Sequence, residues 1–334
     1  MSDLLAKTYE LHPAPPPALP WEDYVNRMQT GWQDLLASHP SEREVQAFLE
    51  RHPSLVPGAH VVPGQLRSGH APFPCSLVTQ PTLTGLTQRT PDFLWMSSDS
   101  LTFSPVFVEL EAPDKPWLTA AGYQSHQLTQ ALHQVDEWSE WFGRLENRQV
   151  FLEAFEVPSY LRQRKWSPVW LLVYGRRDED PEAVSRLRSR LQTANRIVMA
   201  YEHLRPDRDC DDYLCVRRTS NGYRAVTVPP TVRLGPSTAR DLAIVAGKAE
   251  AAAIQEWVTP ERREFLADRF SYWDEWAQGQ HGLISTADRR FLRPTLLFFN
   301  RLNLISVVVF AERARAADTA CSATERSKRT AANE

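Results

Sequence analysis

The chain has 334 residues, of which 42% are hydrophobic and 24% charged, so one large or two ordinary domains with a packed soluble core are expected. Its 38 basic and 41 acidic side chains give a formal net charge of −3. This balance excludes a global basic excess, and a nucleic-acid partner therefore has to be argued from local patches.

The cysteines and the apolar segments indicate the compartment. The four cysteines lack CxxC spacing, which predicts neither a disulfide framework nor a zinc site and fits a reducing cytoplasm. The start of the chain has no apolar segment behind a basic one, which argues against secretion. The most apolar late stretch, residues 296–310, is interrupted by Asn300, Arg301 and Asn303 and is too polar to span a bilayer.

Two helices are predicted near the start. Residues 1–20 form a proline-rich lead of extended or disordered character, and a helix follows over residues 21–36. Ser41 and Glu44 have the spacing of a capping box, which begins a second helix that Pro53 ends. Glu42 lies near the apolar stripe of this helix, so it either faces inward toward a site or only favours the helix N-terminus through the dipole.

The most informative stretch is residues 89–113. After an irregular segment over residues 57–88, the β-prone runs 93–95 and 106–108 are separated by Ser, Asp and Pro, which predicts an antiparallel hairpin. Glu109 and Glu111 then share one face, about 6.5–7 Å apart along the strand, and Asp92 can approach that face. Three carboxylates repel one another unless a cation lies between them. The alternatives are a magnesium or manganese site and an exposed hairpin edge with solvated acids.

A β-α-β unit is predicted after a long helix. Helical spacing continues from residue 123 to Phe142 and includes a polar stripe formed by Gln127, Gln130 and Gln134, which is either functional or a half-buried packing face. Strand 169–174, helix 181–196 and strand 197–201 follow, which favours an α/β fold with a mixed sheet flanked by helices.

Three basic clusters lie between residues 162 and 190. Each either contacts phosphates or is a solvated surface. The clusters are Arg162, Arg164 and Lys165; Arg176 and Arg177; and Arg186, Arg188 and Arg190. Helices are expected over residues 238–257 and 260–278, followed by the apolar stretch 291–310.

The domain prediction is therefore a lead (1–20), a core domain (21–235), a helical C-terminal region (236–315) and a disordered tail (316–334).

Several segments together resemble one known family. They are SEREVQAFLERHPSLV, PDF at residues 91–93, VELEAP at 108–113, YQSHQLTQALHQVDEWSEW, LLVYGRR and IVMAYEHL. In order and spacing, residues 42–204 resemble the Shedu antiphage nuclease family, a branch of the PD-(D/E)xK nuclease superfamily that includes many restriction enzymes. The resemblance implies a restriction-endonuclease-like core.

The resemblance also implies site residues. Asp92 and Glu109 correspond to the metal-binding carboxylates, with the Leu110 carbonyl as a further ligand and Gln134, or Gln130 one turn earlier, as the glutamine of the following helix. Glu42 corresponds to the acid of the N-terminal helix. Glu111 stands where most of the superfamily has lysine; it can bind a second metal ion or act through water as a base. Lys115 is a candidate for a migrated lysine, although Pro113 intervenes.

The implied activity is hydrolysis of DNA phosphodiesters by water activated with magnesium or manganese, with Arg176, Arg177, Lys165 and Gln130 as DNA contacts. The expected setting is cytoplasmic antiphage defence by a homo-oligomer that responds to a phage-derived trigger and needs no membrane. The alternative is a non-catalytic nucleic-acid-binding or sensor module that kept the fold and lost the lysine chemistry.

Overall fold

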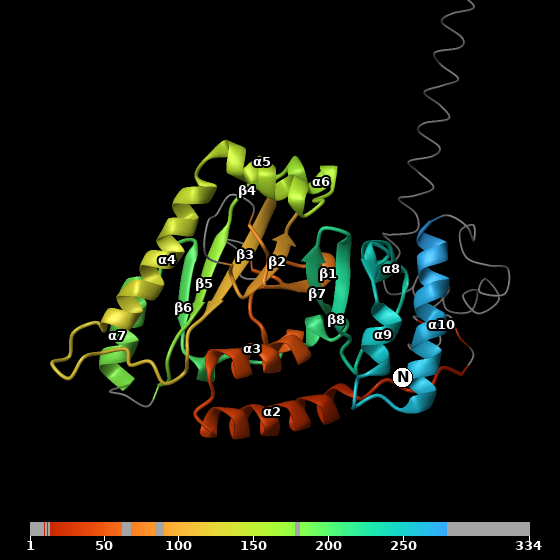
Figure 1. The fold of residues 1–334 in the computed structure, drawn as a ribbon, viewed down its shortest axis with the longest axis horizontal. Helices are drawn as coiled ribbons and strands as arrows, with labels where there is room; N and C mark the ends of the chain where they lie inside the picture. The colour runs from red at the N-terminus through yellow and green to blue at the C-terminus, as the bar shows by residue number, and fades with distance from the viewer. Residues whose placement is uncertain are drawn as a thin grey trace, which may run out of the picture. The chain divides into compact units, whose positions relative to one another are not determined.

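A mixed β-sheet forms the centre of the protein, as a computed structural model shows (Figure 1). The structure describes residues 14–61, 68–83, 90–177 and 181–278, together with Glu10 and His12. The fold below concerns the compact unit Pro15–Gln280. The predictions for residues 291–310 and 316–334, and for most of the residues before Pro15, lie outside the described residues.

The sheet has nine strands among the described residues, in the order β6-β5-β3-β2-β1-β7-β8-β9, with β4 paired to the start of β3. The strands are β1 Phe73–Thr79, β2 Phe93–Ser98, β3 Thr102–Leu110, β4 Lys165–Trp166, β5 Val169–Val173, β6 Arg196–Met199, β7 Leu214–Thr219, β8 Gly222–Thr227 and β9 Val245–Ala246. The expected α/β class with a mixed sheet is confirmed, whereas its relation to the PD-(D/E)xK fold stays a prediction.

The predicted hairpin is the centre of the sheet. β2 and β3 pair antiparallel with Phe93 opposite Val108, as the β-prone runs indicate. On one face Phe107 stacks on Trp170 with ring centroids 4.8 Å apart and contacts Phe142 at the same distance. On the other, the indole of Trp95 donates to the carbonyl of Val56. Both faces of the hairpin are buried, so its ends are held firmly.

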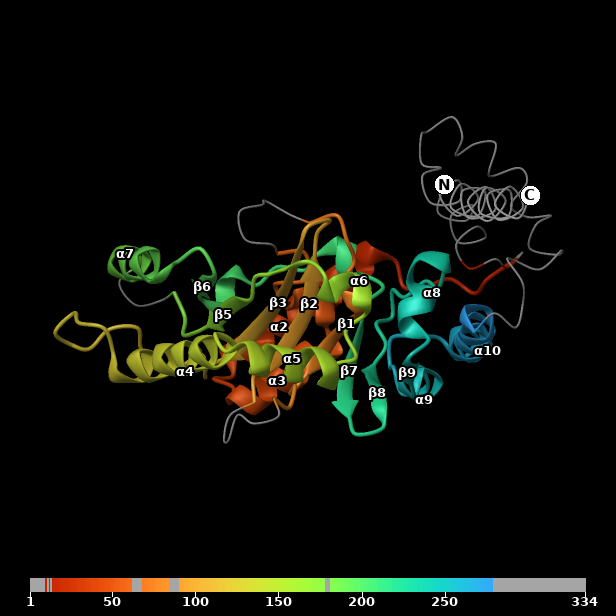
Figure 2. The same cartoon turned by 90° about the horizontal axis from the view of Figure 1, so that it is seen from above.

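The β-α-β prediction is also confirmed. β5 and β6 are parallel, and helix α7 (Pro181–Leu191) connects them. The helix ends five residues earlier than expected because the segment after it turns: Arg196 N donates to Thr193 Oγ1, and Gln192 makes two hydrogen bonds to Val198. Apolar residues of α7 and of α4 (His126–Phe142) pack in one cluster with β5 and β6; Figure 2 shows both helices beside these strands.

Helices α2 (Trp21–Ala37) and α3 (Glu42–Arg51) confirm the first two predicted helices. The capping box is present: Glu44 N donates to Ser41 Oγ, and Ser41 N donates to a carboxylate oxygen of Glu44. Trp32 joins the two helices to the carboxyl end of β6, because its ring lies 5.3 Å from Phe48 and 6.0 Å from Tyr201. The start of α3 is thereby placed near the carboxyl ends of the parallel strands.

The segment after residue 205 differs from the prediction. Strands β7 and β8 were not expected, and the helix expected over residues 238–257 is divided into α8 (Pro236–Leu242), β9 and α9 (Lys248–Ala253). Gly247 breaks it: its φ is +73°, and a Cβ there would lie 3.2 Å from Arg224. α10 (Pro260–Ala277) matches the last predicted helix. The proposed boundary near residue 235 stays a prediction.

Short helices complete the described residues. They are η1 Pro53–Leu55, α5 Leu145–Ala154, α6 Ser159–Arg162, η2 Tyr201–His203 and η3 Arg208–Cys210. Within the described ranges, no helix combines the length and the apolarity that a bilayer crossing requires.

Gly58 packs closely against the β2–β3 hairpin. Its φ is +123°, and a Cβ would lie 2.8 Å from Cγ1 of Val106 and 3.0 Å from the ring of Trp95. We expect Gly58→Ala to lower the free energy of unfolding by roughly 1–3 kcal/mol through strain and overpacking, as measured by urea denaturation. Gly69→Ala is the matched control, because a Cβ at Gly69 meets nothing within 4 Å. If the two variants are equally stable, the segment around Gly58 accommodates a Cβ without strain and the prediction is wrong.

Candidate active site

Asp92 and Glu109 face each other at the open end of the β2–β3 hairpin. The register that pairs Phe93 with Val108 brings these two residues opposite one another. Asp92 accepts a hydrogen bond from the Leu110 amide at 2.7 Å, and its side chain also hydrogen-bonds to that of Glu109. Asp92, Glu109 and Glu111 are only 8–9% exposed. The structure thus brings Asp92 and Glu109 into contact. Glu111 lies within electrostatic reach of Asp92, but the three carboxylates do not come within 4.8 Å of one another.

Burial of Asp92 favours its neutral form. It raises the pKa of Asp92 to about 7, and the negative charges of Glu42 and Glu111 act in the same direction, against the opposing hydrogen bonds from Leu110 and Glu109. A hydrogen bond between two carboxyl groups requires a proton on one of them. A divalent cation can replace that proton, and the all-oxygen donor set fits magnesium or manganese.

Gln134 connects helix α4 to the acids. The helix begins after the N-cap Ser125, whose hydroxyl accepts from Leu128 N, and it presents Gln134 as a half-buried side chain. Nε2 of Gln134 donates to Oε1 of Glu109. Gln130, one turn earlier, is exposed. Of the two glutamines that the sequence offered, the structure brings Gln134 to the acidic cluster.

Lys115 lies beside Glu111. Glu111 is the residue that stands where most members of the superfamily that this sequence resembles have lysine. The two side chains form an ion pair at i,i+4 spacing. The backbone of Glu111 is fixed from both directions: its amide donates to Val173 O, and its carbonyl accepts from the Tyr201 hydroxyl at 2.6 Å. A turn in which Lys115 N donates to Ala112 O then directs the chain back toward the acids. Pro113 therefore does not carry Lys115 away from the cluster.

Glu42 occupies the inward side of the first turn of α3. It is half-buried, and its pKa is raised by burial first and by the charge of Glu111 second, while Lys115 lowers it. Glu44, by contrast, is exposed and forms the capping box. The structure therefore favours the inward alternative for Glu42, within electrostatic reach of Asp92 and Glu111.

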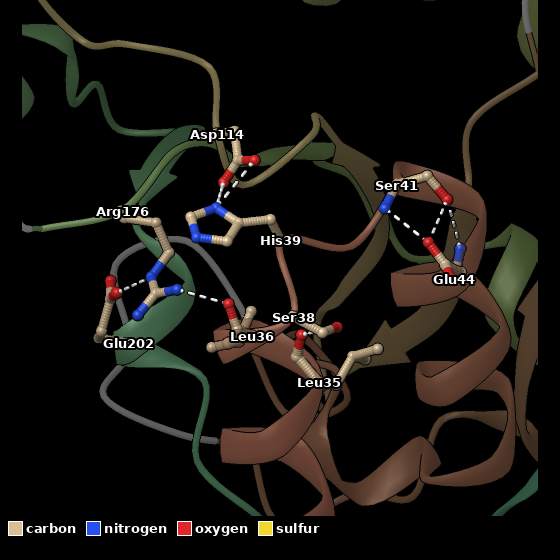
Figure 3. A network of polar contacts seen from close by, with 9 residues as sticks. All are labelled: Leu35, Leu36, Ser38, His39, Ser41, Glu44, Asp114, Arg176 and Glu202. Carbon is tan, nitrogen blue, oxygen red and sulfur yellow. Dashed lines mark hydrogen bonds and ion pairs between the residues drawn. The ribbon is translucent and has the colours of Figure 1, made fainter.

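The predicted DNA contacts occupy different places. Arg176, just after β5, is half-buried and binds Glu202 and the carbonyl of Leu36 (Figure 3). Arg177 is exposed. Lys165 pairs with Thr102, seven residues before Glu109 on β3, so about 23 Å of strand separates it from the acids. Lys165 is therefore not part of the acidic cluster. Its contribution to DNA binding stays a prediction.

Two contacts hold the α2–α3 connection beside the cluster. His39, in the left-handed region with φ 54°, places its imidazole Nδ1 3.1 Å from the Asp114 carboxylate (Figure 3). Asp114 precedes Lys115, so this contact joins the start of α3 to the turn that carries the lysine. Arg176 joins the same connection to β5 through Leu36 O at 2.9 Å.

The comparison with protein families agrees with this geometry. The family model described as Shedu protein SduA, C-terminal, matches residues 39–204. The chain belongs to the Shedu family. The matched segment of this Shedu protein runs from the α2–α3 connection to the end of η2, and so contains the whole acidic cluster with Gln134 and Lys115. The comparison with curated proteins gave no match.

Tyr201 and the ion pair of Lys115 were missed by the sequence analysis as parts of this site. The Glu111–Lys115 spacing is typical of a charge pair within one turn, and that signal was available. No sequence signal indicated the hydrogen bond from the Tyr201 hydroxyl to Glu111 O, because it joins η2 to the residue after β3, 90 positions earlier in the chain.

The raised pKa of Asp92 predicts a pH dependence of stability. A folded-state pKa of about 7 exceeds the unfolded value, so the native state binds more protons between about pH 4 and 7. In EDTA, we expect the free energy of unfolding to fall as the pH rises through this window. Asp92→Asn keeps the acceptor for Leu110 N and removes the charge, so we expect it to raise Tm at pH 8 by at least about 2 °C.

Calorimetry with EDTA at pH 5 and pH 8 checks this, with Asp268→Asn, an exposed acid on α10, as control. If the Tm of the wild type rises between these pH values as much as that of Asp92→Asn, the acids do not repel one another as the structure implies.

Proposed function

We propose that this Shedu protein is a magnesium- or manganese-dependent DNA endonuclease that acts in antiphage defence. The convergence of Asp92 and Glu109 from paired strands, with Gln134 donating to Glu109 and Lys115 paired with Glu111, carries the proposal. Membership of the Shedu family supports the defence role.

Asp92 and Glu109, together with the Leu110 carbonyl, would hold the ion, and the Glu111 carboxylate would join them by moving toward Asp92. When bound, it would supply Lewis-acid activation of water and neutralise charge on the phosphate. Gln134 orients Glu109 through its amide, so that the carboxylate keeps one position. The amide of Leu110 orients Asp92 in the same way. These bonds preorganise the acids, which limits the reorganisation needed when substrate binds.

Lys115 supplies the positive charge that Glu111 lacks. The side chain of Lys115 is 34% exposed and that of Glu111 only 11%, so the lysine lies on the solvent side of the acid. A phosphate approaching from solvent would meet this ammonium before the carboxylates. In this proposal Lys115 binds the scissile phosphate, and Glu111 holds the lysine and contributes to the ion.

Basic side chains beside the carboxyl end of β5 provide a surface for the DNA backbone. Arg177 is exposed, and Arg188 Nη1 lies 3.1 Å from Nε2 of His203. The pKa of His203 is lowered by burial first and by Arg188 second, so a neutral imidazole sits against the guanidinium. Arg176 is engaged by Glu202 and acts as a positioning residue for this surface rather than as a direct contact.

Cleavage requires the paired acids in this proposal. We expect Asp92→Asn and Glu109→Gln each to reduce nicking of plasmid DNA in manganese by at least about 10²-fold, because each removes an anionic ligand while keeping the side-chain size. Asp268→Asn, an exposed acid on α10, should cleave like the wild type. Equal cleavage by all four proteins would refute the assignment. Divalent-independent DNA binding with no cleavage by the wild type would support the sensor alternative.

The role of Lys115 has its own test. We expect Lys115→Gln to reduce the nicking rate by about 10²-fold, because it removes the positive charge that stabilises the phosphate. Lys115→Arg keeps this charge with a different geometry, so we expect it to retain part of the wild-type rate. Arg27→Gln, which removes an exposed positive charge on α2, is the control. A rate for Lys115→Gln equal to that of Arg27→Gln would exclude the role proposed for Lys115.

A further inference from the structure

His60 is a buried histidine whose ring has no hydrogen bond. The residue is 8% exposed, and neither Nδ1 nor Nε2 has a partner. Each neutral imidazole carries one N–H donor and one acceptor nitrogen, and leaving such a group buried and unsatisfied costs roughly 1–3 kcal/mol. Its nearest aromatic ring, that of Tyr213 at 5.9 Å, offers packing only. A buried polar group of this kind needs a partner that the side chains around it do not supply.

Asp207 and Cys210 face the same point. They stand at i and i+3 around η3, where Cys210 N donates to Asp207 O at 3.0 Å. Because side chains three apart in a 3-10 turn lie on one side, the carboxylate and the sulfur point the same way. One ligand atom each of His60, Asp207 and Cys210 lies within 4.8 Å of the other two. This is the only such group of three or more among the residues that the structure describes.

The backbone around these three residues is fixed. Asp207 N donates to Ser54 O at 2.8 Å, which joins η3 to η1. Ser97 Oγ lies 2.8 Å from the carbonyls of Gly58 and Ala59, and Ser68 N donates to His60 O at 2.8 Å. The ligand side chains therefore come from two segments far apart in the sequence that are already held together.

We propose that His60, Asp207 and Cys210 bind a zinc ion that cross-links the segment after η1 to η3. The donor set of one imidazole, one carboxylate and one sulfur suits zinc, which prefers four-coordinate sites with nitrogen and sulfur ligands, and it is a poor match for magnesium. Water completes the coordination on the side of Asp207, which is half-buried while the other two residues are buried. The same triad as a nucleophilic site is disfavoured, because Cys210 is 1% exposed.

This site is independent of the acidic cluster. Its ligands are borderline or soft rather than all oxygen, and Asp207 and Cys210 lie beyond the segment that the Shedu family model matches. The CxxC spacing whose absence argued against zinc is not needed here, because Asp207 takes the place of one cysteine in an i,i+3 turn and His60 comes from a distant loop.

Metal analysis and cobalt substitution of the full chain test the proposal. We use the Asp92→Asn/Glu109→Gln background, so that the acidic cluster does not contribute. We expect one zinc ion per chain after dialysis against zinc, a thiolate-to-metal charge-transfer band with cobalt(II), and a higher Tm with zinc than with EDTA. Cys210→Ala should abolish the charge-transfer band and the Tm shift.

Controls separate ligation from folding. Cys215→Ala removes another buried cysteine, on β7, and should keep all three signals. Asp207→Asn keeps the hydrogen bond to Asp209 N and should weaken cobalt binding at least about tenfold without unfolding the protein. A wild-type chain without stoichiometric zinc and without a charge-transfer band overturns the proposal, as does a Cys210→Ala variant that retains the band.

Discussion

Repulsion between buried carboxylates is the constraint around which this fold is arranged. The β2–β3 hairpin forces Asp92 against Glu109, and the carboxyl ends of the parallel strands bring Glu111 beside them. Such a cluster is stable only with protons or cations among the acids. The neighbouring elements supply partial compensation: the Leu110 amide, the Gln134 amide and the Lys115 ammonium each contact one acid. In the proposed function, a divalent ion between the acids would relieve this repulsion and so would stabilise the fold as well as supply chemistry.

The position of Lys115 changes how the unusual glutamate is understood. Glu111 directly follows β3 and projects from a fixed point. Lys115 reaches this acid from a turn that approaches Gly175 closely. A Cβ at Gly175 would lie 2.9 Å from Lys115 O, so the glycine and the turn depend on each other. In the proposed function, two residues thus share the task of one lysine: Glu111 would add an anionic donor, and Lys115 would add positive charge.

Features encoded in local sequence were predictable, and those that depend on tertiary contacts were not. The capping box of Ser41 and Glu44 and the β-prone runs of the hairpin are set by neighbours in the chain, and both are present. Strand periodicity predicted that Glu109 and Glu111 share one face, whereas the register that sets Asp92 opposite Glu109 comes from the pairing of β2 with β3. The break at Gly247 and the strands β7 and β8 were missed, because pairing across the sheet decides them. The family resemblance identified residues 42–204, close to the matched range, since several weak motifs in the right order are far more specific than each alone.

The proposed zinc ligands also depend on tertiary contacts, so the sequence did not predict them. Spacing along the chain is informative for zinc only when the ligands are close in sequence, and His60 and Cys210 are not. What reveals them is a physical inconsistency in the folded protein: a buried imidazole with no partner beside a buried sulfur and a carboxylate. The two candidate metal sites then divide by chemistry. Hard carboxylates at the end of β3 suit an ion that exchanges with substrate and solvent, whereas the mixed ligands near η3 suit an ion that remains bound and holds two segments together. Removing metal should therefore affect them differently, because a weakly held oxygen site empties first while a thiolate site keeps its ion.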